Sequence, residues 1–345
     1  MTQGSKTISV IIPALNAAST LRDTLESLGS QILKPLEVIV VDNGSTDGTV
    51  SCAQQWALVH PNLSVRVATE SKPGPSAARN QGVEVSEGDI LVFLDSDCVA
   101  PPDWLQKISV EMEKGSAAVG GPCRPDPSVS AIEKYAALSW FSPQEAPESL
   151  DSPFTHRFLL GANMAVSRDA WEKVGGFNEA LQTGEDLELS MHLKQGGIPV
   201  VLTPALAVTH HGASSVSKRI RRAFHHGKLQ AKITQRNFQN LLVISVPGKT
   251  WKAPFPVTIA MEPLSLTKTL VALCLIGSVQ PFLAVAIFLI LLILWECRMV
   301  VVFVRQCVPM TLKGGWLISF GWACARLAME LGRLAGSIRY GVLCW

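Results

Sequence analysis

Several patterns that identify common protein classes are missing from this sequence of 345 residues. Its eight cysteines include no C-x-x-C pair, which argues against a zinc site or a disulfide framework and favours reduced thiols. The net charge of +2 is too small to indicate a nucleic-acid partner. The first residues lack a basic stretch followed by an apolar core and a cleavage site. We therefore expect no secretory signal peptide and a cytoplasmic N-terminal half.

A glycine-rich phosphate loop is also missing. The first apolar segment ends in Pro13-Ala14-Leu15-Asn16, with no G-x-G-x-x-G. This argues against a dinucleotide-binding oxidoreductase, because that class needs these glycines for the turn and the pyrophosphate. A nucleotidyltransferase also uses carboxylates on an α/β sheet, but it usually carries a glycine-rich basic loop at this place. It stays as an alternative that the missing loop disfavours.

Apolar runs alternate with helical patterns through the first hundred residues. Strands are predicted at residues 7–13, 36–41, 63–68 and 89–94, and helices at 16–31, around Ala53 and Trp56, and at 76–85. This alternation predicts an α/β fold with a mostly parallel, Rossmann-like sheet and helices on both faces. A proline-rich stretch from Pro122 to Pro153 is expected to form an irregular connector. Further on, we predict a helix at 171–177, another after Asp186, and strands at 198–202 and 205–208.

The strand at residues 89–94 leads into two carboxylates, Asp95 and Asp97, in the stretch ILVFLDSDC. Side chains at positions i and i+2 of a strand point the same way, so both carboxylates are predicted to reach one spot. Ligands of open α/β sheets bind at the carboxyl ends of the strands. A carboxylate pair there suits Mg²⁺ or Mn²⁺ bridging to phosphates. The alternative is an ordinary capped turn.

A second acidic pair, Glu185-Asp186, precedes an amphipathic helical pattern. Carboxylates at a helix N-terminus are favoured by the helix dipole. Helix capping alone would also explain them.

The rest of the chain is basic and then apolar. Residues 189–261 contain no Asp or Glu, but they contain Lys218, Arg219, Arg221, Arg222, Lys228, Lys232 and Arg236. We interpret residues 216–262 as a basic amphipathic membrane-proximal segment, with a solvated surface or a nucleic-acid patch as alternatives. Leu270 to Trp295 has no charged residue, and this length exceeds the roughly 20 residues that span a bilayer. Residues 263–345 are therefore predicted to be membrane-embedded helices. The run is either one kinked span or a hairpin of two, and Trp316 to Trp345 is either a further span or an interfacial helix.

Five segments in this order, SVIIPALN, VIVVDNGSTDGT, AARNQG, ILVFLDSD and TGEDLEL, resemble those of family 2 glycosyltransferases. The resemblance covers about Thr7 to Ser215. It implies a GT-A fold for a catalytic domain at residues 1–215.

The resemblance also implies roles for particular residues. Those implied to bind the nucleotide sugar are Pro13, Ala14, Asn16, Asp42, Arg79 and Asp95. Those implied to hold a divalent metal, Mg²⁺ or Mn²⁺, are Asp95, Asp97 and His210. On local pattern alone Arg79 is equally consistent with a surface helix arginine. The neighbouring His211 leaves the histidine assignment open, and both could be solvated surface histidines.

Asp186 resembles the catalytic base of an inverting transfer, with Gly161, Asn163 and Glu185 bordering the acceptor. The Q-x-x-R-W motif of processive synthases does not occur, so transfer of single sugars is expected. The expected enzyme is anchored in the membrane, has its catalytic domain on the cytoplasmic side, and uses a lipid or glycan acceptor. A membrane scaffold with a degenerate site is the alternative from another class.

Overall fold

The computed structural model describes residues 6–126, 158–181, 183–211, 216–246, 249–254, 259–261 and 312–344. Most of the proline-rich stretch between Pro122 and Pro153 lies outside these residues, as does Leu270 to Trp295. Of the described residues, those up to 211 form one compact unit and those from 216 onward form another.

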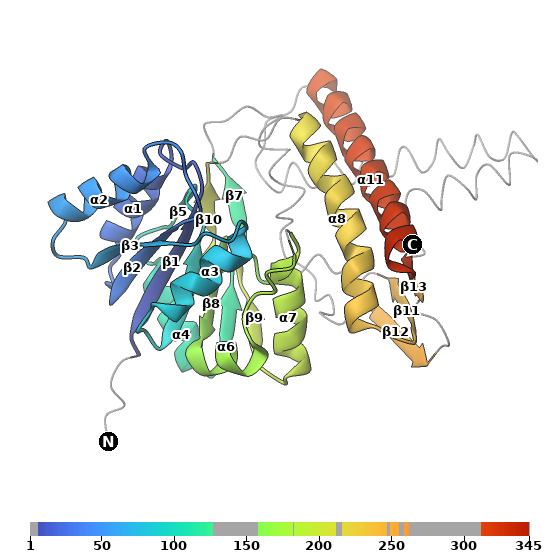
Figure 1. Cartoon of the computed structure of the whole chain (residues 1–345), viewed down its shortest axis with the longest axis horizontal. Coiled ribbons are helices and arrows are strands. Elements are labelled where there is room, and N and C mark those ends of the chain that lie inside the picture. Colours follow the sequence, from blue (N-terminus) through green and yellow to red (C-terminus); the bar gives the residue numbers. More distant parts are fainter. Residues whose placement is uncertain are drawn as a thin grey trace, which may run out of the picture. The chain divides into compact units, whose positions relative to one another are not determined.

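The first unit alternates strands and helices along the chain (Figure 1). Its strands are β1 (Ile8–Ala14), β2 (Glu37–Asp42), β3 (Val65–Thr69), β4 (Ile90–Leu94), β5 (Cys98–Val99), β6 (Ala118–Gly120), β7 (Cys123–Pro125), β8 (Asn163–Ser167), β9 (Val200–Leu202) and β10 (Val208–His210). Its helices are α1 (Leu21–Gly29), α2 (Thr49–Val59), α3 (Pro75–Glu84), α4 (Trp104–Glu113), α6 (Arg168–Val174), α7 (Glu185–Gln195) and the short 3₁₀ helix η1 (Pro204–Leu206).

Seven of these strands form the main sheet, in the order β3-β2-β1-β4-β8-β6-β9. The run from β3 to β4 is parallel, and β8 is antiparallel to both β4 and β6. The carboxyl ends of β1, β2 and β4 therefore share one edge, where the start of β8 also lies because Leu94 pairs with Asn163. The predicted mostly parallel sheet is confirmed.

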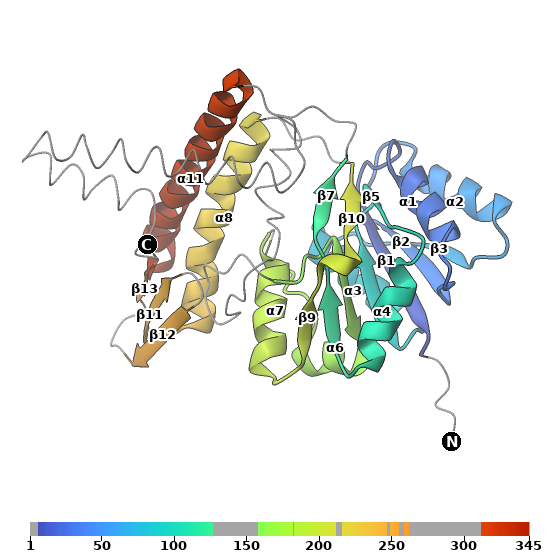
Figure 2. The ribbon, with the colours of Figure 1, turned by 180° about the vertical axis from the view of Figure 1, so that it is seen from behind.

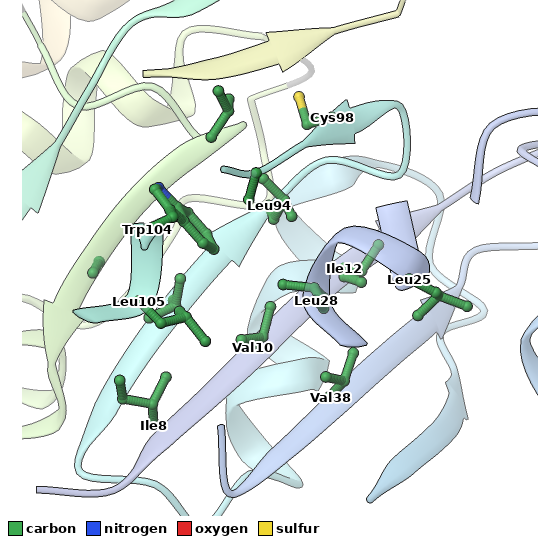
Figure 3. Packing of buried hydrophobic residues seen from close by; sticks show 14 of the residues in the cluster. Ile8, Val10, Ile12, Leu25, Leu28, Val38, Leu94, Cys98, Trp104 and Leu105 are labelled. Carbon is green, nitrogen blue, oxygen red and sulfur yellow. The ribbon is translucent and has the colours of Figure 1, made fainter. Parts of the chain in front are cut away.

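Alternating side chains of the strands fill two cores, one on each face of the sheet. Val10 and Ile12 of β1 pack with residues of α1, α2 and α4, whereas Ile11 packs with residues of α3, α6 and α7. Figure 3 shows the first of these cores, in which Trp104 of α4 lies over the sheet. This alternation is what a strand buried on both faces requires. The prediction of helices on both faces is thus confirmed.

Several predicted boundaries were wrong, and the helix predicted at 171–177 spans Arg168 to Val174. The first helix begins at Leu21 rather than at residue 16, because residues 17–20 form turns that lead into it. Residues 205–208 were predicted as a strand, but Pro204 to Leu206 form η1, and the strand β10 begins only at Val208. The Thr203 side chain accepts a hydrogen bond from the Ala205 amide, which favours the helical turn over an extended chain.

A second, small sheet has the order β5-β10-β7. In it β10 is antiparallel to β5 and parallel to β7, so His210 pairs with Cys98 on one side and Pro125 on the other. This sheet brings β10 against the segment that follows Asp97.

The second unit consists of α8 (Val216–Asn237), α11 (Leu312–Tyr340) and a small sheet. The sheet has the order β12-β11-β13-β14, from β11 (Leu241–Val246), β12 (Lys249–Pro254), β13 (Ile259–Met261) and β14 (Leu343–Cys344). The two helices lie side by side in both views (Figure 1 and Figure 2). Elements from the predicted segments 216–262 and 263–345 therefore fold together.

Glycines set the close approach of these two helices. A Cβ atom on Gly332 would lie 2.0 Å from the Phe224 carbonyl oxygen, and one on Gly227 would lie 1.8 Å from that of Met329. Arg333 is fully buried between the helices and donates from Nε to the Gln230 side chain at 2.5 Å. Within the described ranges, neither α8 nor α11 nor any other helix has the length and apolar character needed to cross a bilayer.

Candidate active site

The loops after β1 and β2 lie together, because Ala14 pairs with Asp42 in the sheet. The Asp42 carboxylate is 7% exposed and accepts hydrogen bonds from the Gly44 and Ser45 amides at 3.3 and 3.2 Å. Asn16 has a positive φ of 51°, and its Oδ1 accepts from the Thr46 amide at 2.9 Å. The structure therefore brings Pro13, Ala14, Asn16 and Asp42 to one place, as ends of two neighbouring strands.

The D-x-D residues form a turn. Strand β4 ends at Leu94, and the Cys98 amide donates to the Asp95 carbonyl at 3.0 Å. Strand alternation therefore does not extend over the pair, and the convergence of both carboxylates on one spot stays a prediction. Asp95 accepts a hydrogen bond from Nη2 of Arg79 at 2.8 Å, whereas Oδ2 of Asp97 lies 3.4 Å from Nε2 of His210.

The two adjacent histidines have different partners. His210 is the last residue of β10, and its ring faces Asp97. His211 follows the strand, and its Nδ1 lies 2.9 Å from the Asp126 carboxylate. Because successive residues of an extended chain point to opposite sides, the His210 ring is directed to Asp97 and the His211 ring to Asp126, although the His211 amide donates to the Asp97 carbonyl.

A group of possible metal ligands surrounds Asp97. Among the described residues, Asp97, Cys98 and His210 offer ligand atoms that all lie within 4.8 Å of one another, and Asp95 is outside this group. A hydrogen bond with Cys123 and burial both raise the pKa of the Cys98 thiol, so this thiol stays neutral. The carboxylate of Asp97 and the imidazole of His210 are ligand types that suit Mn²⁺, and the carboxylate also suits Mg²⁺. This donor set fits a divalent ion.

The second acidic pair lies at the start of α7, as predicted. Gly184 precedes the helix with a φ of 77°, a conformation that glycine adopts without strain. Glu185 is 6% exposed and accepts from Nη1 of Arg79 at 2.9 Å. Asp186 is half-buried, and its carboxylate accepts from the Gly161 amide at 3.2 Å and the Leu187 amide at 2.9 Å.

The Asp186 carboxyl has an unusual acidity. Burial and the neighbouring Glu185 carboxylate raise its pKa to about 7, although the Gly161 amide and the Arg79 guanidinium act in the opposite direction. A carboxylate with a pKa near neutrality can both take up and release a proton under physiological conditions. Asp186 therefore has the property that a general base requires.

The segment before β8 connects the two acidic motifs. The Ala162 carbonyl accepts from the Asp95 amide at 3.3 Å, and the preceding Gly161 amide contacts Asp186. Asn163 is only 1% exposed, and its amide bonds to Trp104, to the Pro122 carbonyl and to the Leu206 carbonyl. Its side chain thus packs inside the domain, and its predicted acceptor-side role stays a prediction.

Sequence reasoning missed three neighbours of the site. Cys98 follows the D-x-D directly, and that position was the one available signal for it. Phe177 lies with its ring centre 5.4 Å from Cζ of Arg79, and Asp126 binds His211. No local pattern marks these two residues, because their contacts come from the folding of distant segments.

Comparison with known proteins identifies relatives across most of the chain. Residues 9–175 match the family model described as glycosyl transferase family 2. The glycosyltransferase AglE of Haloferax volcanii is 31% identical over 239 residues, which cover 68% of this chain and 76% of that protein. The pre-mycofactocin glycosyltransferase of Mycobacterium tuberculosis is 30% identical over 250 residues, but the match covers only 50% of that protein. The chain thus corresponds to half of this second relative.

Solved structures share the fold at lower sequence identity. The mannosyltransferase PcManGT of Pyrobaculum calidifontis, in complex with GDP-Man and Mn²⁺, has a TM-score of 0.62 and 20% identity. That match covers 97% of this chain and 88% of PcManGT. The TarS fragment 1–349 of S. aureus, in complex with UDP-GlcNAc, has a TM-score of 0.50 and 16% identity, over 97% of this chain and 92% of the fragment. The motif carboxylates lie at one edge of this fold, and the match to the 31% identical AglE covers 76% of that protein. The chain therefore belongs to glycosyl transferase family 2 and is a glycosyltransferase.

Proposed function

We propose that the enzyme transfers a single sugar from a UDP- or GDP-type nucleotide sugar to a hydroxyl acceptor, with inversion at the anomeric carbon. The observation that carries this proposal is the placement of Gly161 and Ala162, which contact Asp186 on one side and Asp95 on the other. The base and a donor-side carboxylate therefore flank the same short segment. PcManGT and TarS, which share the fold, bind GDP-Man and UDP-GlcNAc respectively.

The chemistry assigned to Asp186 is that of a general base. The acceptor hydroxyl oxygen forms a bond to the anomeric carbon while the bond from that carbon to the nucleoside diphosphate breaks. The hydroxyl proton goes to the Asp186 carboxylate, whose pKa of about 7 suits proton transfer near neutral pH. The proton acceptor and the leaving group lie on opposite faces of the sugar, which produces inversion.

Donor binding is assigned to the edge formed by β1, β2 and β4. Asp42 is the acceptor for an N–H of the base, because a carboxylate suits the donors of uracil and guanine. Asn16, Pro13 and Ala14 form the loop beside it, where Ala14 pairs with Asp42. Asp95 lies at the end of β4, toward the diphosphate.

A divalent ion, Mg²⁺ or Mn²⁺, would be held by Asp97 and His210, and by Asp95 as the family resemblance implies. When bound, it would offset the negative charge that builds on the diphosphate as the sugar leaves. The Asp97 carboxylate and the His210 ring, 3.4 Å apart, are the side chains that support this assignment.

We place the acceptor, a lipid or lipid-linked glycan, at the cytoplasmic surface of a membrane. Four large apolar side chains of α11 are exposed and recur at helical spacing: Leu327, Leu331, Leu334 and Ile338. The basic helix α8 exposes Arg221, His225 and Arg236, which suits anionic lipid headgroups. The uncharged run Leu270 to Trp295, outside the described residues, is long enough in sequence to enter the bilayer.

The transfer proposal is tested with detergent-solubilised protein and a panel of UDP-, GDP- and dTDP-sugars, with Mg²⁺, Mn²⁺ or EDTA. Release of the nucleoside diphosphate is measured, because slow hydrolysis of the donor needs no known acceptor. We expect metal-dependent release from one nucleotide class and its loss in Asp97→Asn. Formation of a nucleoside triphosphate and a sugar 1-phosphate when pyrophosphate is added to the same panel would instead indicate a nucleotidyltransferase. No turnover and no nucleotide binding would favour the scaffold alternative.

The membrane proposal is tested separately by flotation with liposomes that contain or lack anionic lipid. We expect binding that increases with anionic lipid and weakens in salt. Equal amounts of protein in the floating fraction with and without liposomes would refute the membrane proposal. The proposed transfer reaction would be unaffected.

A further inference from the structure

Arg79 contacts both acidic motifs at once. It lies on α3, is 4% exposed, and donates from Nη2 to Asp95 and from Nη1 to Glu185 at 2.8 and 2.9 Å. The rigid planar fork of a guanidinium holds two such acceptors in a defined geometry. One side chain therefore ties the end of β4 to the beginning of α7, and Glu185 lies 106 positions after Arg79 in the chain.

The Arg79 guanidinium is closely packed against the Gly161 backbone and the Phe177 ring. A Cβ atom on Gly161 would lie 2.9 Å from Cζ of Arg79, so only glycine leaves room for the side chain there. The Phe177 ring lies 5.4 Å from the same atom, at a distance that suits a cation–π contact. Arg79 is thus held in one position by packing as well as by charge.

Charge balance around Asp186 depends on the same residue. A guanidinium keeps its positive charge in proteins, so Arg79 is a cation between the Asp95 and Glu185 carboxylates. Among the described residues, Glu185 on its own helix raises the pKa of Asp186 and Arg79 on α3 lowers it, and Asp95 is the second carboxylate bound by the guanidinium. Arg79 offsets the adjacent Glu185 charge.

We propose that Arg79 is a positioning residue that locks the Glu185-Asp186 pair against the D-x-D turn and sets the protonation of the base, rather than a ligand of the donor diphosphate. This inference rests on the proposed function, since it concerns the residue assigned there as the base. Each Nη group already donates a hydrogen bond to a carboxylate. Turning the guanidinium toward a phosphate would leave Glu185, 6% exposed, as a buried charge without its partner, which is strongly unfavourable.

The test compares Arg79→Lys and Arg79→Gln with Arg168→Lys. Arg168 is a suitable control because it is partly buried and its guanidinium donates to oxygens of Ser86 and Gly88, outside the site. Two quantities are measured in each protein: the Kd for UDP and GDP with Mn²⁺ by calorimetry, and the titration of Asp186 by carbon NMR of labelled aspartate, assigned with Asp186→Asn. Neither quantity requires turnover.

We expect both Arg79 variants to retain nucleotide affinity within about threefold, while Asp186 titrates at higher pH than in the wild type and the Arg168 control. Donor turnover should fall about tenfold or more in Arg79→Lys, because one ammonium cannot bridge both carboxylates. A rise in Kd of more than tenfold with an unmoved Asp186 titration would overturn the proposal in favour of diphosphate binding. Unchanged values throughout would also overturn it.

Gly161→Ala provides a variant that keeps every charge. Its methyl group displaces the guanidinium, so we expect Asp186 to titrate at higher pH here as well, with nucleotide affinity preserved. This variant decides the question if the Arg79 variants do not fold. If the wild type binds a nucleotide but turns over no donor, the proposed function fails. The titration of Asp186 still tests whether Arg79 sets the protonation of that carboxylate.

Discussion

The His210 ring lies 3.4 Å from the Asp97 carboxylate, although the next residue, His211, is directed to Asp126. Of the two adjacent histidines, His210 is therefore the one whose ring can share a metal ion with Asp97. This geometry follows from β10, which pairs with β5 directly after the D-x-D turn.

Replacing His210 should therefore weaken metal binding, whereas replacing His211 should not. We expect His210→Gln to raise the Kd for Mn²⁺ about tenfold or more, because one ligand of the group is lost. The affinity can be measured by electron paramagnetic resonance of free Mn²⁺. Equal affinities of His210→Gln and His211→Gln would contradict the assignment.

Asp186→Asn should abolish transfer and keep donor binding. The amide is nearly isosteric but cannot accept a proton, so we expect the rate to fall about 10²- to 10⁴-fold. Measuring kcat together with the Kd of the nucleoside diphosphate separates catalysis from binding. An active Asp186→Asn enzyme would mean that another group takes the proton.

The pH dependence of the reaction should reflect Asp186. The base must be ionised to act, and its pKa is raised to about 7, so activity should decline below neutral pH. The decline should approach about tenfold per pH unit as the protonated form takes over. A profile of kcat/KM from pH 5 to 9 measures this, and a flat profile across pH 6 to 8 would rule out this role.

Asn163→Ala should destabilise the first unit without altering its chemistry. The substitution leaves the buried Trp104 Nε1 without its acceptor and removes one donor each from the Leu206 carbonyl and the Pro122 carbonyl, which still accepts from the Val208 amide. We expect a loss of about 1–3 kcal/mol in the free energy of unfolding. Denaturant titration followed by tryptophan fluorescence measures this. A raised KM for the acceptor with unchanged stability would instead support the acceptor-side role.

Gly332→Ala should destabilise the second unit, because its new methyl group meets the Phe224 carbonyl. Overpacking of this kind costs about 1–3 kcal/mol. Leu331→Ala is the matched control, since Leu331 is 51% exposed on the same helix and should leave stability unchanged. It should instead reduce liposome flotation. An equal decrease in Tm in both variants would contradict the assignment of helix packing to Gly332 and membrane contact to Leu331.

Sequence patterns predicted those parts of the fold that depend on local order. The strands β1 to β4 and helices α3 and α7 follow from apolar runs and helical spacing, and Asp42, Asp95 and Glu185 were found because strand ends and helix starts have local signals. The partners of these residues have no such signal. Strand β4 ends at Leu94, three residues before Asp97, and a turn follows, so strand alternation does not set the directions of Asp95 and Asp97.

Contacts between distant segments account for what was missed. Strand β5 has two residues and β10 has three, too few to show a period of two in the sequence, yet they place His210 beside Asp97. In the sequence Asn163 follows Gly161 and Ala162, a pattern typical of a loop. Its burial depends on contacts with Trp104 and Leu206. Arg79 could be assigned to a helix, but not to the space between two acidic motifs.

The bridge from Arg79 to Glu185 also determines when the site can exist during folding. Its two ends are separated by 106 positions, and closing so long a loop is entropically costly until the intervening strands are in place. The half of the sheet built by β1 to β4 can collapse early, with Arg79 still lacking one of its two carboxylates. On the ribosome Asp42, Asp95 and Asp97 would be synthesised before both Asp186 and His210, so the nucleotide-binding loops exist before either the base or the last proposed metal ligand.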